Sequence, residues 1–288
     1  MTPDNATLVE RIELDPTLLI FRIRPDVIPA PGEPWFLPGQ YVTIGAAKIQ
    51  RAYSIASEPE ERRWLEFYIR FAREPATVSP LTHLLWTLPV GARLHIGEKI
   101  AGRFTLERTV AAGDTRFKLL VAAGTGLAPF VSMMRHAKRA GDAGALGRFV
   151  ILHGVSHPHE LAYRDELEDA ASRHGLRYLP TVSRPAGHPE WAGLTGRVES
   201  LLEDGRLDSF ELRPDETVVY VCGFRDTIAG SVRRLLGKGY IPEDRRLRRM
   251  LGIADPSAPS LFFEQYDLEP VFDANDTALI ASLRAELK

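Results

Sequence analysis

The 288-residue chain contains a single cysteine, Cys222. One thiol cannot form a disulfide within the chain, and it cannot supply the ligands of an iron–sulfur cluster or a cysteine-rich zinc site. A chain of this size with so little cysteine is typical of a reducing compartment, so we expect a cytoplasmic protein. Hydrophobic residues at 44% and charged residues at 26% exclude a disordered chain and indicate a globular one.

Long apolar runs and an excess of charge of one sign are also missing. No stretch approaches the roughly 18 apolar residues that span a bilayer. The segment Met1–Asn5 lacks a basic and an apolar region, so we expect no secretory leader and no membrane association. Lys and Arg number 36 against 38 Asp and Glu, a formal net charge of −2. This balance argues against a nucleic-acid-binding protein, which carries a clear basic excess.

The first third of the chain is typical of antiparallel β-structure, because short β-prone runs alternate with Pro, Gly and Asp turns. The runs expected to form strands are 6–14, 18–24, 41–44, 52–55 and 64–71. A helix is expected to begin at Ser79–Pro80, since Ser is a favourable N-cap and Pro fits the first helical position. Short strands at this spacing predict a barrel or a sandwich.

Beyond about residue 110, strands and helices alternate. Strands are expected at 117–123, 149–152, 176–180 and 217–221, and helices at 128–139, 160–173, 198–202 and 228–236. The strand runs are continuously apolar, as in a parallel sheet that helices cover on both faces. We therefore predict an antiparallel β-barrel domain over residues 1–110 and an α/β domain with a parallel sheet over residues 111–267.

Residues 268–288 form a C-terminal extension that we expect to be helical. Asp276 is a suitable N-cap, and the apolar residues that follow recur on one side of a helix: Leu279, Ile280, Leu283 and Leu287. This helix packs on the body of the protein, covers a ligand, or joins a second subunit. The apolar side favours the first of these, because such a side is usually buried for packing.

A glycine-rich turn, Gly124-Thr125-Gly126-Leu127-Ala128-Pro129, follows the first expected parallel strand. Glycine lets backbone N–H groups approach a phosphate, and the start of the next helix adds a favourable dipole. The pattern departs from the complete G-x-G-x-x-G dinucleotide fingerprint at its last position, which is Pro129. It indicates either nucleotide binding or a tight turn that needs glycine for its geometry alone.

The end of the second expected parallel strand, residues 152–157, carries no Asp or Glu for a ribose 2′-hydroxyl. A 2′-phosphate would instead require Arg, which is always charged and bonds two oxygens at once. Arg184 and Arg197 are the candidates, with Arg164 and Arg177 as competitors. The alternative for each is an ordinary exposed Arg.

The string Arg51-Ala52-Tyr53-Ser54 lies in an expected strand, where alternation places Arg51 and Tyr53 on one face and Ser54 on the other. A cation, a flat aromatic ring and a hydroxyl suit a ligand that combines phosphate with a conjugated ring. The same string also fits an ordinary amphipathic strand.

Taken in order, the motifs of residues 5–267 resemble those of the ferredoxin/flavodoxin–NADP(+) reductase family, bacterial type. The matching segments are 51–54, 79–81, 124–130, 182–184 with 194–197, 221–223 and 263–266. The family implies FAD and NADP(H) as cofactors. One departure is Ser156, where bacterial relatives often carry Arg.

On the flavin side, the resemblance implies that Arg51 contacts the FAD pyrophosphate, that Tyr53 stacks on the isoalloxazine and that Ser54 bonds near N5. Ser79, with the helix start behind it, binds FAD phosphate. Tyr266 covers the other flavin face.

On the nicotinamide side, the resemblance implies that the turn at Gly124, Thr125 and Gly126 binds the dinucleotide and that Thr125 and Cys222 border the nicotinamide. Arg184 and Arg197 hold the 2′-phosphate, and Glu264 lies near Ser54 in a proton path. By residue type alone, Cys222 is equally well explained as a small buried hydrophobic residue.

The family's activity would be electron transfer between NADP(H) and a one-electron carrier, ferredoxin or flavodoxin, through FAD and hydride chemistry at N5. Catalytic roles fall to Ser54, Cys222, Glu264 and Tyr266. Two alternatives remain: an NAD(P)H-dependent reductase of free flavin or of an oxygenase system, and a subunit that binds flavin or nucleotide without turnover.

A basic segment lies between Arg233 and Arg249, with seven cationic residues against Glu243 and Asp244. It would steer an acidic carrier to the protein, or it is a solvated face. Among the eight His, the spacing of His153, His157 and His159 matches no zinc pattern, so we predict no metal site.

Overall fold

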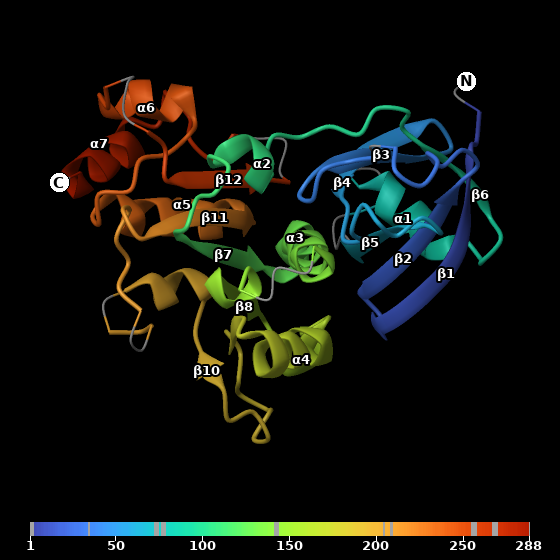
Figure 1. Ribbon diagram of the computed structural model, residues 1–288, viewed down its shortest axis with the longest axis horizontal. Helices are drawn as coiled ribbons and strands as arrows, with labels where there is room; N and C mark the ends of the chain where they lie inside the picture. Colours follow the sequence, from blue (N-terminus) through green and yellow to red (C-terminus); the bar gives the residue numbers. More distant parts are fainter. Residues whose placement is uncertain are drawn as a thin grey trace. The chain divides into compact units, whose positions relative to one another are not determined.

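The computed structural model describes residues 3–33, 35–71, 75, 79–140, 144–203, 205–207, 210–254, 258–266 and 270–287. Two six-stranded sheets organise the chain (Figure 1). The chain divides into two compact units. The N-terminal unit consists of residues 1–112 and 128–142, and the C-terminal unit of residues 113–127 and 143–288.

The N-terminal unit contains an antiparallel sheet in the order β4-β3-β6-β1-β2-β5. Its strands are β1 (Ala6–Asp15), β2 (Leu18–Pro25), β3 (Tyr41–Ala46), β4 (Ile49–Ser54), β5 (Leu65–Arg70) and β6 (Arg93–Ile96). The two edges of the sheet meet just after β4, where the Ala56 N–H donates to the Glu66 carbonyl oxygen of β5 at 2.8 Å. The antiparallel barrel expected from the sequence is therefore confirmed.

The core of this unit lies inside the curved sheet and includes Phe21, Ile44 and Phe67. Helix α1 (Pro80–Thr87) inserts Leu81 and Leu85 into it, and a short helix α2 (Leu106–Thr109) follows β6. The predicted helix start at Ser79–Pro80 is confirmed, because Ser79 is the N-cap residue and Pro80 the first helical residue.

Helix α3 (Ala128–Arg139) is placed in the N-terminal unit, although it follows the first parallel strand in sequence. Its polar side meets the segment that leads from β4 to β5. The contacts are Ser132 Oγ to Ser57 O at 2.7 Å, Arg135 Nη1 to Glu66 Oε1 at 2.8 Å, His136 Nδ1 to Glu60 Oε1 at 2.8 Å and Arg139 Nε to Glu58 Oε1 at 2.7 Å.

Glu66 is the buried centre of this contact and is only 1% exposed. Its carboxylate also accepts a hydrogen bond from Arg22 Nε of β2 at 2.7 Å. Burial opposes ionisation, but the charge of Arg135 and hydrogen bonds from both guanidinium groups outweigh it and lower the pKa of Glu66. The ionised carboxylate therefore joins two strands of the barrel to α3.

The C-terminal unit contains a parallel sheet in the order β10-β9-β8-β7-β11-β12. Its strands are β7 (Phe117–Ala123), β8 (Phe149–Val155), β9 (Arg177–Val182), β10 (Leu194–Thr195), β11 (Thr217–Gly223) and β12 (Leu261–Gln265). The chain proceeds outward from β7 to β10 and then returns to β11 on the other side of β7. The ends of β7 and β11 thus form a topological switch point, where open α/β sheets bind ligands.

Helices and 3₁₀ turns connect these strands: η1 (Gly124–Leu127), η2 (Leu146–Arg148), η3 (Pro158–Glu160), α4 (Arg164–His174), η4 (Val198–Leu202), α5 (Arg225–Leu236), α6 (Arg245–Leu251) and α7 (Thr277–Glu286). The helix expected at 160–173 begins later because Tyr163 has a left-handed backbone conformation (φ 58°). The segment expected to be helical at 198–202 is a 3₁₀ helix.

The C-terminal extension belongs to the core of the C-terminal unit. Asp276 accepts a hydrogen bond from Leu279 N at 2.9 Å and so caps α7, as its sequence predicts. Leu283 is fully buried in the hydrophobic cluster that η4 and α5 share with the sheet. Figure 1 shows α7 beside α6, and contacts join it to both α5 and α6. Among the residues described, no helix is long and apolar enough to cross a membrane.

Candidate functional site

The glycine-rich turn lies at the switch point of the parallel sheet and forms the 3₁₀ turn η1. Gly124 has a left-handed conformation, with φ +53°. A Cβ on Gly126 would lie 2.2 Å from the carbonyl oxygen of Cys222, and one on Gly223 would lie 2.8 Å from Ala123 Cβ. The end of β11 is therefore packed closely against β7 and the turn that follows β7, and this packing requires glycine at 126 in the turn and at 223 on β11.

Three predicted catalytic residues come together beside this turn. Cys222 on β11 pairs in register with Glu264 on β12, and Tyr266 follows the end of β12. Burial raises the pKa of the Cys222 thiol well above its usual range, and the Glu264 charge adds to this, while a hydrogen bond from Tyr266 opposes it. The thiol is therefore protonated at neutral pH. The Tyr266 ring remains 39% exposed.

Phe224 is a feature of this site that the sequence reasoning did not single out. It follows Gly223 directly, it is 50% exposed and its Cε2 lies 3.9 Å from the position of a Cβ on Gly124. An exposed aromatic ring beside the glycine turn offers a flat apolar surface on which a planar ligand could pack. An aromatic residue directly after a Cys-Gly pair at the end of a buried strand was the available signal.

His153 lies beneath the same turn, on β8, and is fully buried. Its Nδ1 is 3.2 Å from the Tyr178 hydroxyl. Burial lowers the pKa of His153 to about 4, although a hydrogen bond with the Gly124 backbone and the charge of Glu160 oppose this effect. The imidazole is therefore neutral at pH 7 and supports the turn without adding charge.

The loops that follow β8 and β9 are joined by a hydrogen bond from Arg184 N to Ser156 O at 2.9 Å. The Arg184 side chain is exposed and makes no ion pair with the residues described. Glu160 fixes the first loop, because its carboxylate accepts hydrogen bonds from Ser156 N at 2.8 Å and His157 N at 3.3 Å.

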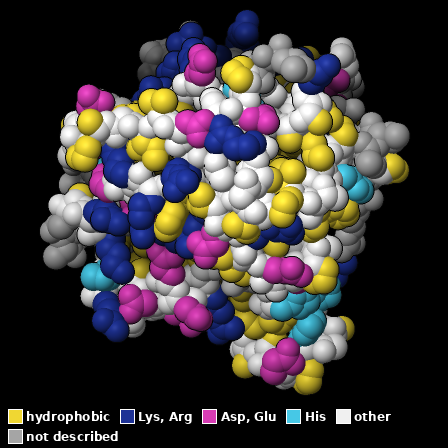
Figure 2. Space-filling model, turned by 90° about the vertical axis from the view of Figure 1, so that its right-hand side faces the viewer, with side chains coloured by type: hydrophobic (Ala, Val, Ile, Leu, Met, Phe, Trp, Pro, Cys, Tyr) yellow, Lys and Arg dark blue, Asp and Glu magenta, His cyan; other side chains and the backbone are white. Residues whose placement is uncertain are grey.

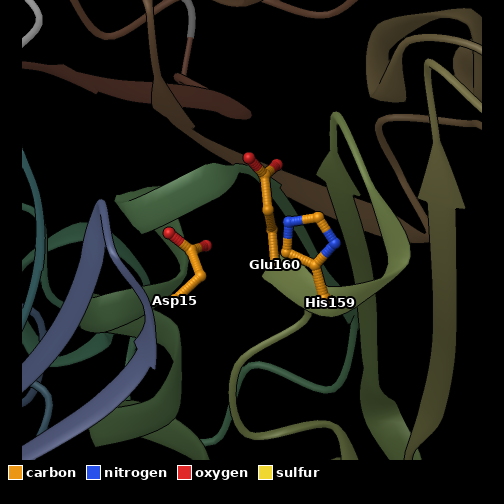
Figure 3. Close-up of side chains that lie close together, drawn as sticks. All are labelled: Asp15, His159 and Glu160. Atoms are coloured by element: carbon orange, nitrogen blue, oxygen red, sulfur yellow. The ribbon is translucent and has the colours of Figure 1, made fainter.

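Figure 3 shows Glu160 beside His159, which both project from η3. The third residue drawn there, Asp15, belongs to the N-terminal unit. Its carboxylate accepts hydrogen bonds from Thr17 N at 2.6 Å and Thr17 Oγ1 at 2.8 Å, which closes the turn between β1 and β2.

The second candidate for the 2′-phosphate, Arg197, is already paired with carboxylates. Its Nε lies 2.5 Å from Glu199 Oε1, and its Nη1 lies 3.6 Å from Asp226 Oδ2. A neighbouring cation that the sequence reasoning missed is Arg206, whose Nη2 donates to Thr195 O at 3.1 Å.

The competing arginines have structural explanations. Arg164 forms an ion pair with Glu168 one helical turn away, at 2.7 Å. Arg177 lies over the rings of Phe117 and Phe210, 5.4 and 5.6 Å from their centroids. The Arg164 guanidinium is therefore paired with a carboxylate, and that of Arg177 is held against two aromatic rings, so Arg184, Arg197 and Arg206 are the better candidates for a phosphate.

In the N-terminal unit, β4 carries Arg51, Tyr53 and Ser54. Arg51 is exposed, Tyr53 is half-buried against the core and Ser54 is 5% exposed. Burial raises the pKa of Tyr53 to about 12, with a small opposing effect of the Arg51 charge. The phenol is therefore neutral and presents a flat ring beside a cation.

Helix α1 packs against β3 and β4 and brings Ser79 to the same region. Among the described contacts, the Ser79 hydroxyl makes no hydrogen bond that caps α1. The first N–H groups of the helix therefore keep their capacity to bind an anion. Together with Arg51 and the Tyr53 ring, this donor set fits the phosphates and the aromatic ring of a flavin dinucleotide.

The basic segment 233–249 is largely occupied by contacts within the C-terminal unit. Arg234 forms an ion pair with Glu203 at 2.8 Å, and Arg246 lies 3.9 Å from Asp273. Arg248 is only 7% exposed. Asp244, counted as an opposing charge, caps α6 by accepting from Leu247 N at 2.6 Å. The exposed basic excess is therefore smaller than the sequence suggests.

Known proteins share parts of this sequence and this two-sheet fold. The sequence model of the Oxidoreductase NAD-binding domain matches residues 120–234. Ferredoxin–NADP reductase A of Sorangium cellulosum is 31% identical over 222 residues, which cover 71% of this chain and 74% of that protein. The reductase component of phenol 2-monooxygenase from a Pseudomonas species is 27% identical, over 86% of this chain and 66% of that protein.

Among solved structures, a ferredoxin NADP+ reductase from Neisseria gonorrhoeae with bound FAD and NADP superposes with a TM-score of 0.73. It is 23% identical, and the match covers 91% of this chain and 98% of that one, so it supports the fold. The sequence relatives also show the family, because ferredoxin–NADP reductase A is 31% identical to this chain and the match covers 74% of that protein. The chain belongs to the ferredoxin–NADP reductase family of oxidoreductases.

Proposed function

We propose that this chain transfers electrons between NADP(H) and a one-electron carrier, ferredoxin or flavodoxin, with FAD as its bound cofactor. The observation that carries the proposal is the switch point, where the glycine turn packs against Cys222, and Cys222 in turn contacts Tyr266. FAD supplies the redox chemistry, since its N5 exchanges a hydride with nicotinamide and its ring also passes electrons singly. The protein binds, orients and shields the reacting groups.

Binding of FAD falls to residues 1–110, which lie within the N-terminal unit. Arg51 neutralises pyrophosphate charge, and Ser79 with the uncapped start of α1 adds hydrogen bonds to phosphate. Tyr53 offers a neutral ring for stacking, because burial keeps its phenol protonated. Ser54, on the opposite face of β4, supplies a hydroxyl near N5.

Binding of NADP(H) falls to residues 111–267, on which helix α7 packs. Gly124, Thr125 and Gly126 let the backbone approach the dinucleotide. Arg184 is the principal ligand of the 2′-phosphate, because it is exposed and unpaired in the described part of the chain. Arg197 contributes less, since binding phosphate requires it to leave Glu199 or to share its charge.

The catalytic groups act by position rather than by covalent chemistry. Cys222 borders the nicotinamide as a neutral thiol and excludes water, because its raised pKa disfavours the nucleophilic thiolate. Tyr266 would cover one face of the flavin ring, the face on which the nicotinamide would also stack. Glu264 would donate and accept protons for the reacting groups, and its negative charge helps to raise the pKa of the neighbouring Cys222 thiol.

The carrier is proposed to approach the basic segment 233–249. Arg233 and Arg249 are its better candidates, because they are exposed and donate hydrogen bonds to the uncharged Ser282 Oγ and Arg245 O. Arg234 and Arg246 face carboxylates, and Arg248 is buried. Charge reversal of Arg233 and Arg249 would lower the rate of carrier reduction and leave flavin reduction by NADPH unchanged. Equal loss of both rates would contradict this docking site.

The test is an anaerobic absorbance spectrum of the purified protein before and after NADPH, and separately after NADH. A yellow protein that NADPH bleaches faster than NADH, and that then reduces ferredoxin or flavodoxin, supports the proposal. A colourless protein that fails to take up added FAD would refute it.

A reductase of an oxygenase system is the second candidate, because the phenol 2-monooxygenase reductase component matches 86% of this chain. With one cysteine, these 288 residues cannot supply the ligands of an iron–sulfur cluster, so the electron acceptor would lie outside them. Assays with a set of oxygenase components and with ferredoxin and flavodoxin would separate the two functions.

A further inference from the structure

Three histidines from two separate loops gather at the carboxyl end of the parallel sheet. His157 and His159 lie in the loop after β8, and His188 lies in the loop after β9. The His157 and His159 rings stack with centroids 5.5 Å apart, and the His188 centroid lies 5.2 Å from that of His157 and 5.9 Å from that of His159. On the face drawn in Figure 2, histidine side chains form one patch near the lower right, and other histidines lie apart from it.

The distance between two ring nitrogens points to a ligand. His157 Nδ1 lies 3.1 Å from His188 Nε2. Two imidazole nitrogens that each bind one Zn²⁺ at roughly 2.0–2.1 Å would lie about 2.9–3.4 Å apart. This range covers N–Zn–N angles from those of square-planar to those of tetrahedral coordination. The pair is therefore set at the spacing of a metal chelate before any ion arrives.

An acidic neighbour prepares His188 for this role. Glu190 Oε1 lies 3.2 Å from His188 Nδ1, so the carboxylate accepts the Nδ1 proton and leaves Nε2 with its lone pair. Carboxylates that bond the far nitrogen of a ligating histidine fix its tautomer and raise its basicity. His157 would bind a metal through Nδ1 in the tautomer that carries its proton on Nε2.

We propose that His157 and His188 chelate a divalent transition metal that favours imidazole, with Zn²⁺ as its best representative. His159 is the third ligand, after a rotation of its exposed side chain, and water completes a tetrahedron. Glu190 is a positioning residue that acts through His188. The metal would link the loop after β8 to the loop after β9, which also carry Ser156 and Arg184.

The experiment uses full-length protein without a histidine tag, freed of metal by dialysis against EDTA. Zn²⁺ binding is measured by calorimetry, and Co²⁺ binding by its visible absorption, which reports tetrahedral coordination. We expect one Zn²⁺ per chain and at least a 100-fold loss of affinity in His188→Gln and in His157→Gln. Glu190→Gln is expected to weaken binding about 10- to 100-fold.

His174→Gln is the matched control, because His174 lies outside the cluster, in the last turn of α4. It should bind Zn²⁺ as the unaltered chain does. Equal affinity in His188→Gln and in the unaltered chain, or an unaltered chain that binds no Zn²⁺, would overturn the proposal. Far-UV circular dichroism confirms that each variant is folded, and none of these measurements requires FAD or NADP(H).

Discussion

Replacement of Gly126 by Ala tests whether the packing of β7 against β11 builds the switch point. The new Cβ would lie 2.2 Å from the Cys222 oxygen and 2.6 Å from its carbonyl carbon. Both neighbours are backbone atoms of the buried strand β11, so no side chain can rotate to make room. Because ordinary carbon contacts are about 3.5 Å or a little less, the turn that carries Gly126 and β11 must separate by about 1 Å.

Overpacking of a rigid core costs about 1–3 kcal/mol, and a clash with backbone belongs at the upper end, about 3 kcal/mol. For a unit of this size, that loss lowers the unfolding temperature by roughly 6–12 °C. The assay is thermal and urea unfolding followed by circular dichroism, with amide hydrogen exchange of β7 and β11 as the local readout. We also expect weaker NADPH binding, because the turn is displaced.

Two glycines provide a graded control for Gly126→Ala. Gly124→Ala meets no atom closer than 3.9 Å but has φ +53°, so only backbone strain of about 1–2 kcal/mol applies. Gly147→Ala meets nothing within 4 Å, and its effect should stay within about 0.5 kcal/mol. A Gly126→Ala protein as stable as Gly147→Ala would refute the close packing of the two strand ends.

Four further changes test other parts of the structure. Glu66→Gln should lower the free energy of unfolding at pH 7 by about 2–3 kcal/mol, measured by urea titration. Folding lowers the pKa of Glu66, so its ionised carboxylate stabilises the protein above the unfolded pKa of about 4.3, and this stabilisation is lost as the pH falls through the folded pKa. On acidification, the Glu66→Gln variant should therefore lose less stability than the unaltered protein. Leu283→Ala should cost about 2–4 kcal/mol in the same assay, since α7 is part of the core. Arg184→Ala should raise the KM for NADPH about 10- to 100-fold and leave that for NADH unchanged in steady-state assays. Tyr266→Ser should tighten nicotinamide binding and slow turnover, and unchanged values of both would remove Tyr266 from this role.

The strands and helices whose signals are local could be predicted from the sequence. Residues 117–123 and 128–139 form β7 and α3 within the expected bounds, because an apolar run and a helical pattern meet at a glycine turn. Strand β12 could not be found in this way. Its five residues become a strand by pairing with β11, some 40 positions earlier in the sequence. Helix α6 has four arginines among seven residues and depends on its Asp244 cap and on burial of Leu247 and Leu251.

Some features of the candidate site could likewise be predicted from the sequence, and others could not. Motifs placed the glycine turn, Cys222 and Tyr266 at one end of one sheet, because parallel strands share a direction. The sequence does not show which charges pair, because pairing depends on how the folded backbone directs the side chains. Arg197 and Arg184 are therefore equal candidates in the sequence, whereas the structure places Glu199, two residues further on, and Asp226 beside Arg197. The histidine cluster was missed for the same reason, since His188 joins it from 31 residues beyond His157.

The position of α3 has a practical consequence for anyone who exchanges parts among relatives of this protein. A chimera cut once, near residue 112, would pair α3 from one parent with the Glu58, Glu60 and Glu66 carboxylates of another. Such a junction would preserve both sheets and still leave a foreign helix on the barrel. Transplanting the barrel intact requires two segments, residues 1–112 and 128–142, with the first parallel strand and its glycine turn retained between them.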